Sequence, residues 1–204
     1  AASLKAMGTY GIIQGAPFYV GAVVAPAPHA FVDLGYVFEE LILILTEKGY
    51  GTCWMGGTFS RASFAREAKL LGEEALGAIS PVGRPLEKRS VVEKIVRAVA
   101  GSRNRKPWEA LFFDGSFRAP LSREAAGPWA EPLDCVRVGP SASNRQPWRV
   151  VKEGPFFHFF LSRTAGYGGG LFRGIDLQAM DLGIAMCHFE AAARECGLAG
   201  ATVT

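Results

Sequence analysis

The tripeptide Asp-Leu-Gly occurs twice, each time in a segment whose apolar residues recur at helical spacing. It stands at residues 33–35 and again at 181–183. The distance from Gly35 to a helix-ending Gly49 equals that from Gly183 to Gly197. The spacing predicts helices over 33–48 and 176–196, followed by small residues in both places. Chance could produce one such tripeptide, but the combination favours an internal repeat related by a pseudo-twofold axis.

The composition describes a folded chain with no strong charge bias. The 204 residues are 49% hydrophobic and 20% charged, and 22 basic against 19 acidic residues give a net charge of +3. This composition excludes predominant disorder and a nucleic-acid-coating surface. The longest strongly apolar run, residues 41–45, is too short to span a membrane. Four cysteines without a CxxC pair favour reduced thiols and a cytoplasmic location.

The remaining pattern predicts further strands and helices. We expect a buried strand over 18–24, a strand over 78–82 and a hairpin of 148–151 with 156–161. Helices are expected from Ser60 to about residue 71, from residue 90 to 101, and after Ser122 with a break at 127–128 and near Pro132. The polar, basic and then aromatic stretch 101–117 is interpreted as a connector outside either core.

Two segments have the composition of a binding site. GTCWMGG at residues 51–57 ends a predicted helix in a glycine-rich turn, where a flat ligand could approach the backbone closely. PSASNRQPW at residues 140–148 is a row of small and amide side chains suited to the polar edge of a heterocycle. Each also has a purely structural interpretation, as an ordinary helix-ending turn and as a polar loop.

Together these segments resemble the FMN-dependent nitroreductase family, in which a PSxxNxQPW loop and a GTCWxGG turn both contact the flavin. The loop normally precedes the turn, and here the order is reversed. With the repeat, this resembles the branch in which one chain holds two nitroreductase-like halves. The resemblance covers most of the chain, through residues 8–11, 80–83, 105–108 and 183–190. It implies an α+β nitroreductase-like fold, an internally duplicated pseudo-dimer with mixed or antiparallel sheets flanked by helices.

The resemblance also implies the division of the chain and the residues around the cofactor. We expect a first half over residues 1–100, a connector over 101–120 and a second half over 121–204. Flavin-lining residues carried over by position are Trp54, Met55, Gly56, Gly57, Pro140, Ser141, Ala142 and Asn144. A backbone N–H near Gly56 or Gly57 is expected beside flavin N5.

Arginine and lysine are the natural partners of the FMN phosphate. The position before the last helical segment assigns this role to Arg103, Arg105 and Lys106, with Lys88 and Arg89 as a second possibility. Family members begin with an Arg/Ser-rich segment that also holds the phosphate, and no such segment precedes Ala1. The first half is therefore expected to be incomplete at its N-terminus.

The implied activity is hydride transfer from NADH or NADPH through FMN to a nitroaromatic, a quinone or a similar acceptor, with no catalytic side chain. The alternative is a flavin-binding module without turnover. The internal repeat predicts a monomer, with no nucleic-acid or membrane partner. His29, His158 and His188 form no metal-ligand pattern, and Cys53 has no base nearby in the sequence, so neither a metal site nor thiol catalysis is expected.

Overall fold

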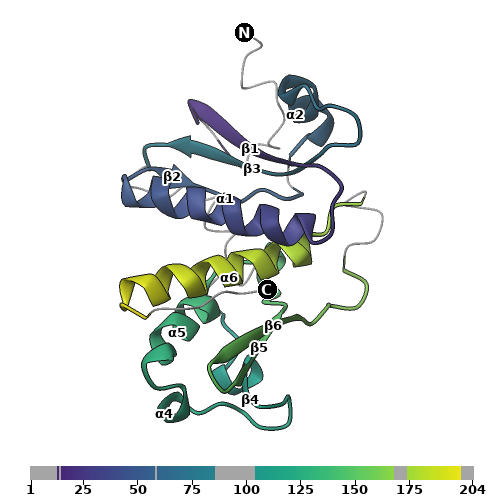
Figure 1. Ribbon diagram of the computed structural model, residues 1–204. Helices are drawn as coiled ribbons and strands as arrows, with labels where there is room; N and C mark the ends of the chain where they lie inside the picture. Colours follow the sequence, from purple (N-terminus) through teal and green to yellow (C-terminus); the bar gives the residue numbers. More distant parts are fainter. Residues whose placement is uncertain (1–12, 14, 58, 86–103, 168–173, 199–204) are drawn as a thin grey trace.

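Two long helices lie side by side at the centre of the molecule, each with a small sheet on its outer side (Figure 1). The computed structural model describes residue 13 and residues 15–57, 59–85, 104–167 and 174–198. The helices are α1 (Ala30–Glu47) and α6 (Leu177–Glu195). One sheet has the order β1-β3-β2 and the other the order β4-β5-β6. The fold is therefore α+β, with one antiparallel and one mixed sheet.

The N-terminal sheet packs against α1. It consists of β1 (Phe18–Val24), β2 (Gly51–Thr52) and the central β3 (Ala75–Gly83), all in antiparallel pairs. The expectation of a buried β1 was wrong, since none of its residues is fully buried. It is an edge strand. The central strand β3 is almost entirely buried, and it includes the strand expected over residues 78–82.

The contact between α1 and α6 is closest at the two glycines of the repeated tripeptide. A Cβ on Gly35 would overlap the backbone carbonyl of Met180, and a Cβ on Gly183 would overlap that of Val32. Each glycine thus faces the carbonyl three residues before the other glycine. Only a residue without a side chain allows the two backbones to approach this closely.

The C-terminal sheet is built mainly from the expected hairpin. β5 (Trp148–Glu153) and β6 (Phe156–Leu161) are antiparallel, which confirms the hairpin, and β4 (Phe112–Asp114) runs parallel to β5. The interpretation of 101–117 as outside either core was wrong in its second part. Leu111 and Phe112 have no solvent-accessible surface, and they pack in the core with Trp148 and Phe189.

The shorter helices begin and end only partly where the sequence predicts. Ser122 accepts a hydrogen bond from Ala125 N–H and starts α4 (Arg123–Ala126), which gives way to the 3₁₀ turn η3 (Gly127–Trp129). Pro132 does not break α5 (Ala130–Val138), because it lies in the first turn, where no intrahelical donor is needed. α2 (Arg61–Ala68) follows Ser60 but ends early, at a left-handed Lys69.

Within the described parts of the chain, no helix is long and apolar enough to cross a membrane. Residues 86–103, and with them the expected helix over 90–101, Lys88 and Arg89, lie outside the described residues.

The glycine contact predicts the effect of adding one methyl group at either position. Gly35→Ala and Gly183→Ala should each lower the free energy of unfolding by at least about 2 kcal/mol, although alanine is the better helix former by about 1 kcal/mol. Chemical denaturation measures the loss. The control is Gly21→Ala on β1, where the tightest contact of a Cβ would be with the movable end of the Leu76 side chain, 3.1 Å away, and the other contacts are at ordinary distances. Unchanged stability in both helix variants would contradict the close packing.

Candidate functional site

A cavity of about 380 Å³ lies where the turn after α1 and the loop before β5 meet the first turns of α6. Its volume falls within the usual range for small-molecule sites, about 300 to 1,000 Å³. The turn contributes Trp54, Gly56 and Gly57, and the loop contributes residues 140–143. The rest of the lining consists of Ala78, Tyr167, Leu177, Met180, Asp181 and Ile184.

The glycine turn is fixed from behind by backbone and arginine contacts. Met55 pairs with Ile79 of β3 through two backbone hydrogen bonds of 2.9 and 3.1 Å. The guanidinium of Arg61 donates to the carbonyl oxygens of Gly56, Leu76 and Gly77. These contacts hold the turn against the sheet, so that Gly56 and Gly57 form one wall of the cavity. A Cβ on Gly56 would lie 2.7 Å from the Leu177 side chain on the opposite wall.

The indole of Trp54 is held by a buried carboxylate of α1. Its Nε1–H donates to Glu39 Oε2 at 2.5 Å, and the other oxygen, Oε1, lies 2.7 Å from His188 Nε2 on α6. Glu39 is only 2% exposed. Phe38 packs edge-on against the indole, with ring centroids 4.8 Å apart. Glu39 therefore joins both central helices to the cavity wall.

The loop before β5 contains three left-handed residues that are not glycine. Ser143, Asn144 and Gln146 have φ values of 49°, 53° and 49°, which non-glycine residues adopt at a cost. Internal hydrogen bonds support this geometry: Gln146 N–H donates to Ser141 Oγ at 2.9 Å, and Gln146 Nε2 donates to the Asn144 carbonyl at 3.0 Å. The strained loop presents its residues 140–143 to the cavity.

Asp181 anchors that loop to α6 from inside the cavity. Its Oδ1 accepts the Ala142 N–H at 2.9 Å. The side chain is almost completely buried, and Oδ2 has no hydrogen-bond partner among the described residues. Burial, together with a smaller effect of the Asp176 charge, raises the pKa of Asp181 from 3.8 to about 8, although the hydrogen bond from Ala142 acts in the opposite direction. Near neutral pH the carboxyl is therefore mainly protonated.

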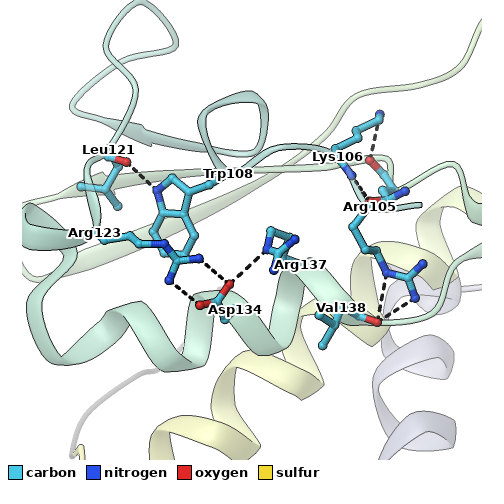
Figure 2. Close-up of polar contacts among 9 residues, drawn as sticks. Arg105, Lys106, Trp108, Leu121, Arg123, Asp134, Arg137 and Val138 are labelled. Atoms are coloured by element: carbon cyan, nitrogen blue, oxygen red, sulfur yellow. Dashed lines mark hydrogen bonds and ion pairs between the residues drawn. The ribbon is translucent and has the colours of Figure 1, made fainter. Parts of the chain in front are cut away.

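Two basic residues lie behind the loop. Arg105 donates to the Val138 carbonyl from Nε and Nη2 at 3.3 and 2.9 Å (Figure 2). Its Nη1 donates to Asn144 Oδ1 at 3.0 Å. Lys106 donates its backbone N–H to Gln146 Oε1 and its ammonium to the Gln146 carbonyl. Partial burial lowers the pKa of both groups. Neither belongs to the cavity lining.

The profile of the family described as "Putative TM nitroreductase" matches residues 3–193. The chain belongs to this nitroreductase family. No curated protein matches the sequence.

A similar solved structure is the crystal structure of a putative nitroreductase from Thermotoga maritima. It is 24% identical, with a TM-score of 0.57 over 89% of this chain. The chain spans 63% of the length of that protein. At this identity the likeness shows a shared nitroreductase fold.

The cavity includes some of the residues carried over from the nitroreductase resemblance and leaves out others. Trp54, Gly56, Gly57, Pro140, Ser141 and Ala142 line it. Met55 does not, because its side chain packs in the core between α2 and β3. The amide of Asn144 bonds Asn104, Arg105 and Gln146 instead of belonging to the lining. Arg103 lies outside the described residues.

Sequence reasoning missed the wall contributed by α6. Leu177, Met180, Asp181 and Ile184 line the cavity, and their spacing of three and four residues puts them on one helical face. That spacing was visible in the sequence, and one acidic residue within an otherwise apolar face was the available signal.

The environments of Cys187, His158 and His188 indicate packing and pairing with carboxylates. Cys187 is buried, which raises the pKa of its thiol to about 12. His188 pairs with Glu39 as described, and His158 lies 3.7 Å from Glu153 near the surface. Among the described residues no three His, Cys, Asp or Glu side chains are grouped as a metal site would require.

The bonds of Glu39 predict how its loss affects the Trp54 wall. Glu39→Leu should lower the free energy of unfolding by about 2 to 3 kcal/mol, because it leaves the Trp54 N–H and His188 without their buried acceptor. It should also change the part of the tryptophan emission that Trp54→Phe removes.

The matched control is Glu40→Leu, since Glu40 is half-buried and its ion pair with Arg194 is a 3.8 Å surface contact. That variant should cost less than about 1 kcal/mol. Equal losses of unfolding free energy in the two variants would contradict a stabilising role of the Glu39 bonds to Trp54 and His188.

Proposed function

We propose that the cavity binds FMN and that the chain is an FMN-dependent oxidoreductase. It would transfer hydride from NADH or NADPH to a nitroaromatic, a quinone or a similar planar acceptor. One observation carries the proposal. The glycine turn and the polar loop, about ninety residues apart and both assigned to the flavin by resemblance, line the same cavity. Membership of a nitroreductase family supports the reaction class.

The lining has the chemistry that an isoalloxazine ring requires. Trp54, Leu177 and Ile184 offer apolar surface, while the Ser141 and Ser143 hydroxyls and the turn backbone offer hydrogen-bonding groups. The space between Gly56 and Leu177 would be reduced by any side chain at Gly56. The unpartnered Oδ2 of Asp181 adds a buried polar atom that a bound ring could satisfy.

The protein's part in the reaction is to bind and orient. Bound FMN would supply the capacity to accept and donate a hydride. A backbone N–H of Gly56 or Gly57 is the proposed donor toward flavin N5, held in place because Arg61 binds the Gly56 carbonyl. Trp54, fixed by Glu39, would exclude water from one side. No side chain is assigned the role of a catalytic acid or base, and the nicotinamide is expected to stack on the flavin.

Arg103, Arg105 and Lys106 remain the proposed partners of the FMN phosphate. The cavity lining contains no basic side chain among the described residues. Arg105 and Lys106 bind the backbone carbonyls of Val138 and Gln146, at the two ends of the 138–146 segment. The phosphate would thus be held outside the lining described here, on the side of the loop that carries these two residues.

The duplication is also part of the proposal. Its support is the reciprocal contact of Gly35 with Met180 and of Gly183 with Val32, the arrangement that a twofold relation between α1 and α6 produces. The proposed division remains residues 1–100, a connector 101–120, and residues 121–204. Because the repeat supplies the interface internally, we propose a cytoplasmic monomer, which light scattering at the mass of one chain would support.

Blocking the cavity should weaken FMN binding. Gly57→Val would place a branched side chain on the wall formed by the turn and should raise the FMN dissociation constant by about tenfold or more, measured by flavin fluorescence titration. Gly21→Val, on β1 outside the cavity lining, is the control and should bind like the wild type. Equal affinity in both variants would refute the site.

The visible absorbance of the wild-type protein with FMN, before and after NADH or NADPH is added, separates the reductase from its alternative. A yellow wild-type protein that NADH or NADPH bleaches supports the oxidoreductase. A yellow protein that neither nicotinamide bleaches supports the binding module without turnover, and a protein that binds no FMN contradicts both.

A further inference from the structure

The least satisfied polar atom in the cavity belongs to Asp181. The residue is 3% exposed and lines the cavity, and its Oδ1 is engaged by the Ala142 N–H. Oδ2 has no partner among the described residues. A buried polar atom without a partner is costly. A ligand in the cavity is the group that can supply the missing bond.

The ionisable groups around Asp181 provide no counter-charge for a carboxylate. On its own helix, Asp176 carries a negative charge, which Arg163 neutralises through two hydrogen bonds of 2.6 and 3.1 Å. Tyr167 lines the cavity, and the guanidinium carbon of Arg145, which is not a lining residue, lies over its ring at 5.6 Å from the ring centre. From α1, Glu39 lies behind Trp54 and is paired with His188.

The described parts of β3 and of the glycine turn add no ionisable side chain to the lining. An ionised Asp181 would thus be buried without a cation among the described lining residues. Burial without a cation therefore favours the protonated form of Asp181. In this form the Oδ2 hydroxyl can donate a hydrogen bond to a ligand in the cavity.

We propose that Asp181 binds the flavin as a neutral carboxylic acid, its Oδ2–H donating to a carbonyl oxygen or ring nitrogen of the isoalloxazine. The inference rests on the proposed function and extends it to a residue that the resemblance does not assign. Oδ1 would hold the 140–143 loop through Ala142, while Oδ2 would hold the ring. One side chain would thus set the position of the ring relative to the loop.

The other copy of the repeated tripeptide has no such role. Asp33 occupies in the first copy the place of Asp181 in the second, but its side chain is exposed on α1 and does not line this cavity. Both aspartates are followed by Leu-Gly, but their surroundings in the structure differ. Asp33 is therefore the matched control for every substitution at Asp181.

The test measures FMN dissociation constants at pH 7 and pH 9 for wild type, Asp181→Asn and Asp33→Asn. If only the protonated acid binds, wild-type affinity should fall about tenfold between these values, as a group with a pKa of about 8 ionises. The asparagine at 181 keeps an acceptor for Ala142 and places an N–H donor at the other position. It should bind within about twofold of the wild type at pH 7 and lose the pH dependence. Asp33→Asn should behave as the wild type.

A second measurement needs no flavin. The infrared difference spectrum between ligand-free wild type and Asp181→Asn at pH 7 should contain the band of a protonated carboxyl. A carboxylate band there would overturn the inference, whether or not the variant binds FMN.

The binding outcomes separate this inference from the proposed function. Wild-type FMN binding with the same pH dependence in all three proteins would overturn the role of Asp181 and leave the function standing. So would tenfold weaker binding by Asp181→Asn at pH 7, because it would indicate an ionised acceptor. No FMN binding by the wild type at either pH would overturn the proposed function itself, and the flavin role of Asp181 with it.

Discussion

The close approach of α1 and α6 is the constraint on which the rest of the structure depends. Gly35 and Gly183 let each helix lie against the backbone of the other, and any side chain at these two positions would overlap a carbonyl group. Each sheet then packs on the outer side of its own helix, as Figure 1 shows. The cavity arises beside this contact, because Met180, whose carbonyl faces Gly35, and its neighbour Asp181 also belong to the cavity lining. The helix contact and the cavity therefore share residues of α6, so that a change in the helix packing would also change the cavity wall.

The site depends on polar groups that connect elements distant in the sequence. Glu39 joins α1 to Trp54 and to α6, and Asp181 joins α6 to the loop at Ala142. Both carboxyl groups are almost fully buried, yet their situations differ. Glu39 has a partner for each oxygen, whereas Asp181 has one for Oδ1 only. A satisfied buried carboxyl stabilises a wall, and an unsatisfied one is available to a ligand.

Sequence patterns predicted the elements whose signals are local. The 18–24 strand, the 148–161 hairpin and both long helices were found from periodicity, glycines and turns, and the two loop motifs indicated two walls of one cavity. Signals that depend on distant partners were missed. Leu111 and Phe112 become core only because a short parallel strand places them beside β5. The α6 wall became a site only when packing brought residues 177–184 to the two loops. The repeated tripeptide alone does not distinguish the buried Asp181 from the exposed Asp33, because its two copies are identical.

The central claim is that a flavin lies between the glycine turn and the polar loop, against the α6 wall. A crystal structure of the protein grown with FMN tests this most directly. The account predicts isoalloxazine density in contact with Trp54, the Gly56–Gly57 backbone and Asp181. Density for FMN at any other place on the protein, with this cavity empty, would contradict it.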